Sequence, residues 1–125
     1  MMTERIFNYS NILKTALDAT YLRDKVISQN VANVDTPGYK KKSVAFEEQV
    51  QKALDSHKRA SQINLSTLKA QVIQPMNGMS YRMDQNNVDI DVETVEQTKN
   101  YLRYQALVDQ VTYDLRRFKT VLNAR

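Results

Sequence analysis

A long helical pattern that begins near the N-terminus stops at the stretch Asn30-Val31-Ala32-Asn33-Val34-Asp35-Thr36-Pro37-Gly38-Tyr39. No helix continues through it, because the residue before a proline is pushed toward extended geometry. Pro37 and Gly38 predict the centre of a type II turn, since proline fixes φ at the first central position and glycine accepts a positive φ at the second. We expect Asn33 to end the helix in the left-handed conformation. Local chemistry alone predicts a helix stop and a turn.

The helix before this stretch is predicted to run from about Glu4 to Ala32, so that residues 1–33 form the first segment of the fold. Polar residues recur at the spacing of one helical face, at Asn11, Lys14, Asp18, Lys25 and Gln29. Apolar residues fill the rest of the surface, among them Leu13, Ala16, Leu17 and Ile27. A helix of this length needs a partner along its apolar face to be stable in water.

Residues 34–90 are predicted to form a small irregular segment. Val44 lies in a short extended run that leads into an amphipathic helix from about Phe46 to Asp55. Asn77-Gly78 is typical of a β-hairpin turn, because both residues tolerate the positive φ of that turn. The apolar strand positions of this hairpin would be Val72, Met79, Tyr81 and Met83.

A second long helix is predicted over residues 91–125, with Asp91 as its N-cap and with Ile90 and Val95 at the spacing of a hydrophobic staple. Its acidic start and basic end complement the helix dipole. Apolar residues repeat every three or four positions as a heptad seam, at Tyr104, Val108, Val111, Leu115, Phe118 and Leu122. A second apolar line, which includes Leu102, lies on another face.

We expect this seam to pack against the first helix, with Leu13, Ala16 and Ile27 as its contacts. The predicted fold is therefore mainly α, with two long terminal helices pairing as a coiled-coil-like layer and a small middle segment that contains a β-hairpin. Both helices carry more apolar surface than one partner covers. A monomeric soluble protein rarely leaves such a patch in water, so the terminal helices are predicted to mediate assembly.

The composition argues against catalysis and against metal or cofactor binding. The 125 residues include two glycines, two prolines and no cysteine, which excludes disulfides, thiolate metal sites and a cysteine nucleophile. His57 is the only histidine and lies in a polar stretch, so no catalytic triad or zinc site is predicted. A calcium-binding loop from Asp84 fails, because Val95 stands where its bidentate glutamate belongs.

Membrane and nucleic-acid partners are not expected either. Charged and polar side chains interrupt the apolar residues of positions 1–20, so we expect no cleaved signal peptide, and no run is long enough to span a bilayer. Basic residues gather near the C-terminus, but the apolar seam interrupts them and the end of a helix attracts cations in any case.

The stretch quoted first resembles the signature of the bacterial flagellar axial proteins, which build the rod and hook. That signature reads A-N-x-x-T-P-G-Y after an upstream S-x-N, which Ser28-Gln29-Asn30 supplies. Four further runs, residues 22–27, 39–47, 86–91 and 102–107, resemble rod proteins of this family. The resemblance covers residues 12–50 and 85–122, and residues 51–84 are not matched to the family. The signature positions are Asn30, Ala32, Asn33, Thr36, Pro37, Gly38 and Tyr39.

The resemblance implies a structural subunit of the proximal rod of the flagellar basal body, which transmits torque. Such subunits are exported by the flagellar type III apparatus without a cleaved signal and assemble in the periplasmic space as a helical hetero-oligomer. The implied partners are copies of the chain, other rod subunits (FlgC, FlgF and FlgG), the FliE adaptor and the FliF ring protein. The alternatives are another rod subunit such as FlgC and a cytoplasmic coiled-coil adaptor that binds nucleic acid.

The assembly interface is assigned to apolar residues of both terminal helices. These are Leu13, Ala16, Leu17, Ile27, Leu102, Tyr104, Val108, Val111, Leu115, Phe118 and Leu122.

Overall fold

Two long helices and a small middle segment make up the fold, which we describe from a computed structural model for residues 2–56, 62–74 and 82–124. The elements are α1 (Met2–Ala32), β1 (Ser43–Ala45), α2 (Glu47–Asp55), the 3-10 helix η2 (Leu65–Thr67), β2 (Gln71–Ile73) and α3 (Ile90–Asn123). The prediction of a mainly α fold with paired terminal helices is confirmed.

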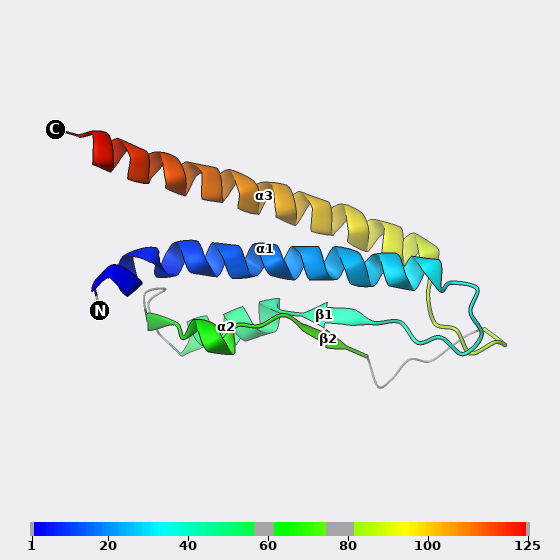
Figure 1. Cartoon of the computed structure of the whole chain (residues 1–125). Coiled ribbons are helices and arrows are strands. Elements are labelled where there is room, and N and C mark those ends of the chain that lie inside the picture. The colour runs from blue at the N-terminus through cyan, green and yellow to red at the C-terminus, as the bar shows by residue number, and fades with distance from the viewer. Residues whose placement is uncertain (1, 57–61, 75–81, 125) are drawn as a thin grey trace.

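Helix α1 is the middle layer of the molecule. Figure 1 shows α3 running antiparallel to it on one side, so that both chain termini lie at the same end, and the strands and α2 on the other side. The polar face predicted for α1 is confirmed, since Asn11, Lys14, Asp18, Lys25 and Gln29 are all exposed. The rest of the helix surface is therefore free to contact two layers.

The middle segment packs on α1 through a small apolar core. Ala19 of α1 and Phe46, Ile63 and Leu68 of the middle segment are buried together, and partly buried apolar side chains from α1 and α2 surround them. This burial holds a largely irregular segment in place, because each fully buried large apolar side chain stabilises by roughly 1.5–3 kcal/mol.

The two strands form an antiparallel pair in which Val44 lies opposite Val72. The extended run before a short helix is confirmed, and α2 begins at Glu47. Val72 is thus in a strand, as expected, but its described partner lies far back in the chain. The hairpin turn predicted at Asn77-Gly78, with Met79 and Tyr81, lies outside the described residues.

The end of α1 differs in one respect from the sequence prediction. Asn33 is not left-handed, since Gly38 and Gln85 are the positive-φ residues of the described chain. The side-chain Nδ2 of Asn33 instead donates to the Gln29 carbonyl at 2.8 Å, which satisfies a helix-end carbonyl without a change of backbone hand. The turn itself is confirmed: Gly38 has φ 72°, and the Tyr39 N–H donates to the Thr36 carbonyl at 3.2 Å.

Helix α3 starts earlier than predicted. Its N-cap is Asp89, not Asp91, because the Asp89 side chain accepts from the N–H groups of Asp91 and Val92. Asp89 has extended backbone geometry, as an N-cap requires, and Asp91 is already inside the helix. The staple spacing inferred from Asp91 therefore does not apply.

The face of α3 that meets α1 coincides with the predicted seam only in part. Glu93, Asn100 and Asp114 are the buried residues of α3, whereas the seam residues Tyr104, Val108, Leu115 and Leu122 are exposed. Val111 and Phe118 are half-buried. Polar side chains can occupy this face because each finds a hydrogen-bond or ion-pair partner on α1 or near its end.

Candidate assembly site

The signature stretch is organised around Asn30, whose side chain is completely buried. Its Nδ2 donates to the Lys42 carbonyl at 2.8 Å and to Glu93 Oε2 at 3.1 Å. Its Oδ1 accepts from the Lys42 N–H at 3.0 Å and from the Tyr39 hydroxyl at 3.2 Å. One amide therefore joins the end of α1, the entry to β1 and the start of α3, with all four of its hydrogen-bonding positions used.

A second buried amide, Asn86, fixes the loop between the helix end and the turn. Its Nδ2 lies 2.8–2.9 Å from the carbonyl oxygens of Asn33, Val34 and Thr36. Its Oδ1 accepts from the Val88 N–H at 2.8 Å, which shapes the approach to α3. Each of these carbonyls also accepts from another donor, namely the Thr36 N–H, Arg82 Nη1 and the Tyr39 N–H respectively, so Asn86 adds a second hydrogen bond to each.

The neighbours of Asn86 hold the turn in the same way. The Gly38 N–H donates to the Asp84 carbonyl at 2.7 Å, and the Lys41 N–H donates to Asn87 Oδ1 at 2.6 Å. The run of residues 82–87 therefore lies along the signature loop, although about fifty residues separate them in sequence. We call residues 30–42 and 82–93 together the junction.

An ion pair closes the junction at α3. Lys41 Nζ lies 2.7 Å from Glu93 Oε1, and the Glu93 side chain is 1% exposed. Tyr39 lies beside it: burial, followed by the negative charge of Glu93, raises the pKa of the Tyr39 hydroxyl above its ordinary value.

Polar contacts continue along the interface between α1 and α3. Asn100 Nδ2 donates to the Thr20 carbonyl at 2.9 Å, and the Ser10 hydroxyl donates to Asp114 Oδ2 at 2.5 Å. Positions 93, 100, 107 and 114 are seven residues apart, so they follow one heptad line. Buried polar groups on such a line pair only in one register, which fixes how the two helices slide against each other.

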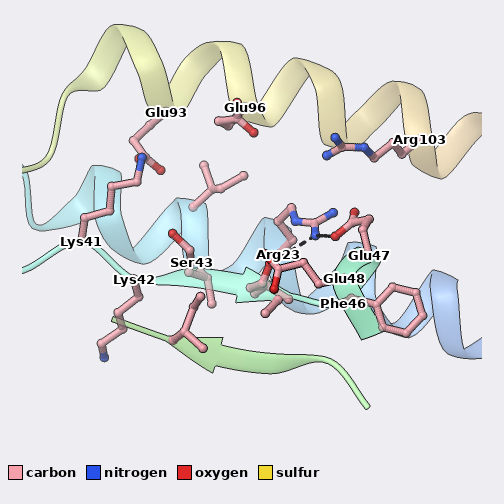
Figure 2. A pocket seen from close by; sticks show the side chains of 15 residues that line it. Arg23, Lys41, Lys42, Ser43, Phe46, Glu47, Glu48, Glu93, Glu96 and Arg103 are labelled. Atoms are coloured by element: carbon pink, nitrogen blue, oxygen red, sulfur yellow. Dashed lines mark hydrogen bonds and ion pairs between the residues drawn. The ribbon is translucent and has the colours of Figure 1, made fainter. Parts of the chain in front are cut away.

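A charged groove of about 400 Å³ lies between α3 and the strand layer (Figure 2). Arg103 and Glu96 project into it from α3, and on its other side Arg23 pairs with Glu47 at 2.5 Å. Burial raises the pKa of Glu47, but the hydrogen bond and charge of Arg23 outweigh it and leave that pKa below its ordinary value. For Glu96, the hydrogen bond from Lys99 lowers the carboxyl pKa, against a smaller opposing effect of burial.

Two ion pairs are formed by these charged groups: Arg23 pairs with Glu47, and Glu96 pairs with Lys99 of the same helix. Among residues 2–56, 62–74 and 82–124, no cluster of three or more His, Cys, Asp or Glu side chains could hold a metal ion. In the same residues, no helix is long and apolar enough to cross a bilayer. The groove's opposed charges instead stabilise the contact between layers.

The residues assigned to assembly fall into two groups. Leu13 and Ile27 are buried within the chain, and Ala16 and Leu17 are half-buried. On α3 the assigned residues that face outward are Leu102, Tyr104, Val108, Leu115 and Leu122. Half-buried Phe118 stacks on Phe7 of α1, with ring centroids 5.5 Å apart. Tyr104, Val108, Leu115 and Leu122 lie along one face of α3 and leave apolar surface that the described residues do not cover.

No local pattern in the sequence singles out the side chains that hold the junction together from the α3 side. In the sequence, Asn86 stands out only as part of a run that resembles the family, and Glu93 only as part of the acidic start of a helix. Asn100 does not stand out. The seven-residue spacing of Glu93, Asn100 and Asp114 does mark one face of the helix. Heptad patterns are normally identified from apolar residues, so a polar heptad line is easily overlooked.

Comparison with known proteins shows which family has a similar sequence. The family model described as flagella basal body rod protein matches residues 11–40, which include most of α1 and the signature. The flagellar basal body rod protein FlgB of Bacillus subtilis is 36% identical over 115 residues, with 88% of this chain and 89% of the relative covered.

Proteins of the same name from two other organisms are also similar to this chain, at lower identity. FlgB of Borreliella burgdorferi is 31% identical over 120 residues, covering 85% of this chain and 89% of the relative. FlgB of Escherichia coli is 27% identical over 122 residues, covering 87% and 88% respectively. The resemblance drawn from the signature is therefore confirmed, and the chain belongs to the FlgB family of flagellar basal body rod proteins, which are structural subunits and not enzymes.

Proposed function

We propose that the chain is a subunit of the proximal rod that assembles with copies of itself and with other rod subunits through α1 and α3. In this proposal residues 1–33 and 91–125 form an inner coiled-coil layer of the rod, and residues 34–90 form a smaller outer segment. The carrying observation is the uncovered apolar surface of α3, where Leu115 is 63% and Leu122 is 82% exposed.

The energetics favour assembly through this surface. Covering a leucine that is mostly exposed stabilises a contact by roughly 1.5–3 kcal/mol, and several such residues lie along one face of α3. A contact between two different surfaces of identical subunits generates an open helical array when its rotation does not close into a ring, and an open helical array is the geometry of a rod.

The junction would set the direction in which the outer segment leaves the inner layer. Asn30 and Asn86 are fully buried and fix the loop carbonyls, the turn and the start of α3 relative to one another. A rigid junction suits a subunit that transmits torque, because a loose one would let the outer segment rotate independently. The signature residues thus act as structural parts with no catalytic role.

The wider setting follows from the family relationship. We propose that the neighbours are FlgC-, FlgF- and FlgG-like subunits, the FliE adaptor and the FliF ring protein, in the periplasmic space. Delivery would occur through the flagellar type III export apparatus.

Replacement of a related subunit tests the proposal. The chain is expressed in a Bacillus subtilis strain that lacks its own FlgB, and swimming and isolated basal bodies are examined. The wild-type chain is expected to restore rods, and Leu115→Asp/Leu122→Asp is expected to abolish them while the purified chain keeps its helical circular dichroism. Lys14→Asp, on the exposed polar face of α1, is the control. Normal rods from the double aspartate variant would exclude this α3 surface as an interface.

A further inference from the structure

A second groove, of about 530 Å³, lies at the interface between α1 and α3 and is separate from the charged groove of Figure 2. Its walls include Tyr21 and Asp24 from α1 and Asn100, Tyr101 and Tyr104 from α3. Among the described residues that line it, none is a lysine or an arginine. We call it the tyrosine groove.

The wall of the tyrosine groove contains an unpaired hydrogen-bond acceptor. Asn100 is 4% exposed, and its Nδ2 is used by the Thr20 carbonyl. Its Oδ1 has no hydrogen-bond partner within the described part of the chain. A buried acceptor without a partner is costly, so a donor from outside the chain that reached this oxygen would stabilise the fold.

The remaining walls favour a cationic donor. Tyr21, Tyr101 and Tyr104 are all substantially exposed, and aromatic faces attract lysine and arginine side chains. Asp24 is exposed at the groove and adds a negative charge. The Tyr101 hydroxyl accepts from Gln105 Nε2 at 2.9 Å, which holds one ring in place. A carboxylate and three aromatic rings together match a guanidinium or an ammonium group.

The chain itself carries such groups on another part of its surface. Arg116, Arg117 and Lys119 are exposed near the end of α3, four to five helical turns from the groove. The rise of 1.5 Å per residue puts them about 25 Å away, so they cannot reach the groove of their own chain. They can reach the groove of a neighbouring copy.

We propose that the tyrosine groove receives a basic side chain from the C-terminal end of α3 of a second copy of this chain. The inference rests on the proposed function and names one contact of the assembly. The two surfaces differ, so the contact is heterologous and leaves a free groove and a free basic end on every pair. Repetition of this contact extends the array without closing it into a dimer.

Cross-linking tests the contact cleanly, because the chain has no cysteine. Thr98→Cys places a thiol at the groove, and Thr120→Cys places one beside the basic residues without removing them. The two positions are 22 residues apart on one helix, roughly 33 Å, which a short bismaleimide cannot bridge within one chain. The double variant is treated in isolated basal bodies and as the purified full-length chain at high concentration.

A ladder of dimers, trimers and longer products is expected from the double variant, and an equal mixture of the two single variants is expected to stop at dimers. Each single variant alone is expected to stay monomeric. Rods that assemble without the ladder would overturn the inference while leaving the proposed function intact. Products that stop at dimers in the double variant would also overturn it, since they indicate a two-fold contact.

A charge exchange tests the chemistry. Asp24→Lys is expected to reduce the cross-linked fraction at least about fivefold, as is Arg116→Asp/Arg117→Asp/Lys119→Asp, and their combination is expected to recover it. Asp18→Lys, on the exposed polar face of α1, is the matched control and should leave the ladder unchanged. An unchanged ladder in Asp24→Lys would rule out recognition of a basic side chain. If the purified chain forms the ladder but does not restore rods in a strain that lacks its own FlgB, the proposed function is contradicted and the groove contact is not.

Discussion

The side chains of Asn30 and Glu93 meet in the interior of the junction, with Asn30 Nδ2 3.1 Å from Glu93 Oε2, although 63 residues separate them in sequence. The contact links the end of the first helix to the first turn of the last one. Because both side chains are almost completely buried, the two helices cannot separate here without exposing or unpairing an amide and a carboxylate.

Removal of the Asn30 amide should therefore destabilise the chain strongly. Asn30→Ala leaves Glu93 and the Lys42 backbone without their partner, and we expect a loss of about 3 kcal/mol in the free energy of unfolding. Chemical denaturation of the purified chain, followed by circular dichroism, measures it. Asn33→Ala, which removes two exposed hydrogen bonds, one to the Gln29 carbonyl and one from the Thr36 hydroxyl, should cost less, about 1 kcal/mol. Equal losses in both variants would contradict the central role of Asn30.

The turn at Gly38 depends on backbone conformation alone. A Cβ at this position would meet no atom within 4 Å, but its φ of 72° is unfavourable for residues with side chains. We expect Gly38→Ala to lower the free energy of unfolding by about 1–2 kcal/mol. Gly38→Asn should lose less, because asparagine tolerates the left-handed region better than alanine does. Chemical denaturation measures both losses. A larger loss in Gly38→Asn than in Gly38→Ala would indicate a side-chain clash.

The ion pair between Lys41 and Glu93 should be sensitive to removal of the lysine. Lys41→Met leaves a buried carboxylate without its cation, and we expect a loss of about 2 kcal/mol, below the ~3–5 kcal/mol of a fully buried pair because Lys41 is partly exposed. Lys42→Met is the control, since the Lys42 side chain points away from Glu93 (Figure 2). Addition of Glu93→Gln to Lys41→Met should recover part of the loss in thermal melts.

The lowered pKa of Glu47 predicts a loss of stability in acid. A folded-state pKa below the ordinary value of 4.5 gives stability that is complete above that value and is lost as the pH falls through the folded pKa. The free energy of unfolding should therefore fall from about pH 4.5 downward, and Glu47→Gln should flatten this fall. The Glu47 side chain is about half exposed, so solvent screening keeps the effect small. Glu48→Gln at the next position is the control, and an identical acid slope in wild type and Glu47→Gln would exclude the Arg23 pairing as its cause.

Asn86 should control the order of the signature loop. Asn86→Asp keeps the shape of the side chain but places a carboxylate against the carbonyl oxygens of Asn33, Val34 and Thr36. We expect faster amide hydrogen exchange in residues 34–39, while the middle of α1 keeps its protection. Asn87→Asp, which retains the oxygen that accepts from Lys41, should leave the loop protected. Unchanged exchange in Asn86→Asp would show that the loop is held by other contacts.

Local chemistry in the sequence determined the elements of this protein. The extents of α1 and α3, the polar face of α1, the turn at Gly38 and the extended run at Val44 followed from periodicity, from the lack of helix breakers and from proline and glycine geometry. These features depend on neighbours within a few residues, so they can be read without knowing the fold.

Tertiary structure decided which surfaces meet. Periodicity identified an apolar seam on α3 but could not say what covers it, and the face that meets α1 carries Glu93, Asn100 and Asp114 instead. Burial of those side chains depends on partners 63 to 104 residues away, such as Ser10 for Asp114, which no local pattern encodes. The same pairing leaves the apolar side chains of Tyr104, Leu115 and Leu122 at the surface, available to neighbouring subunits.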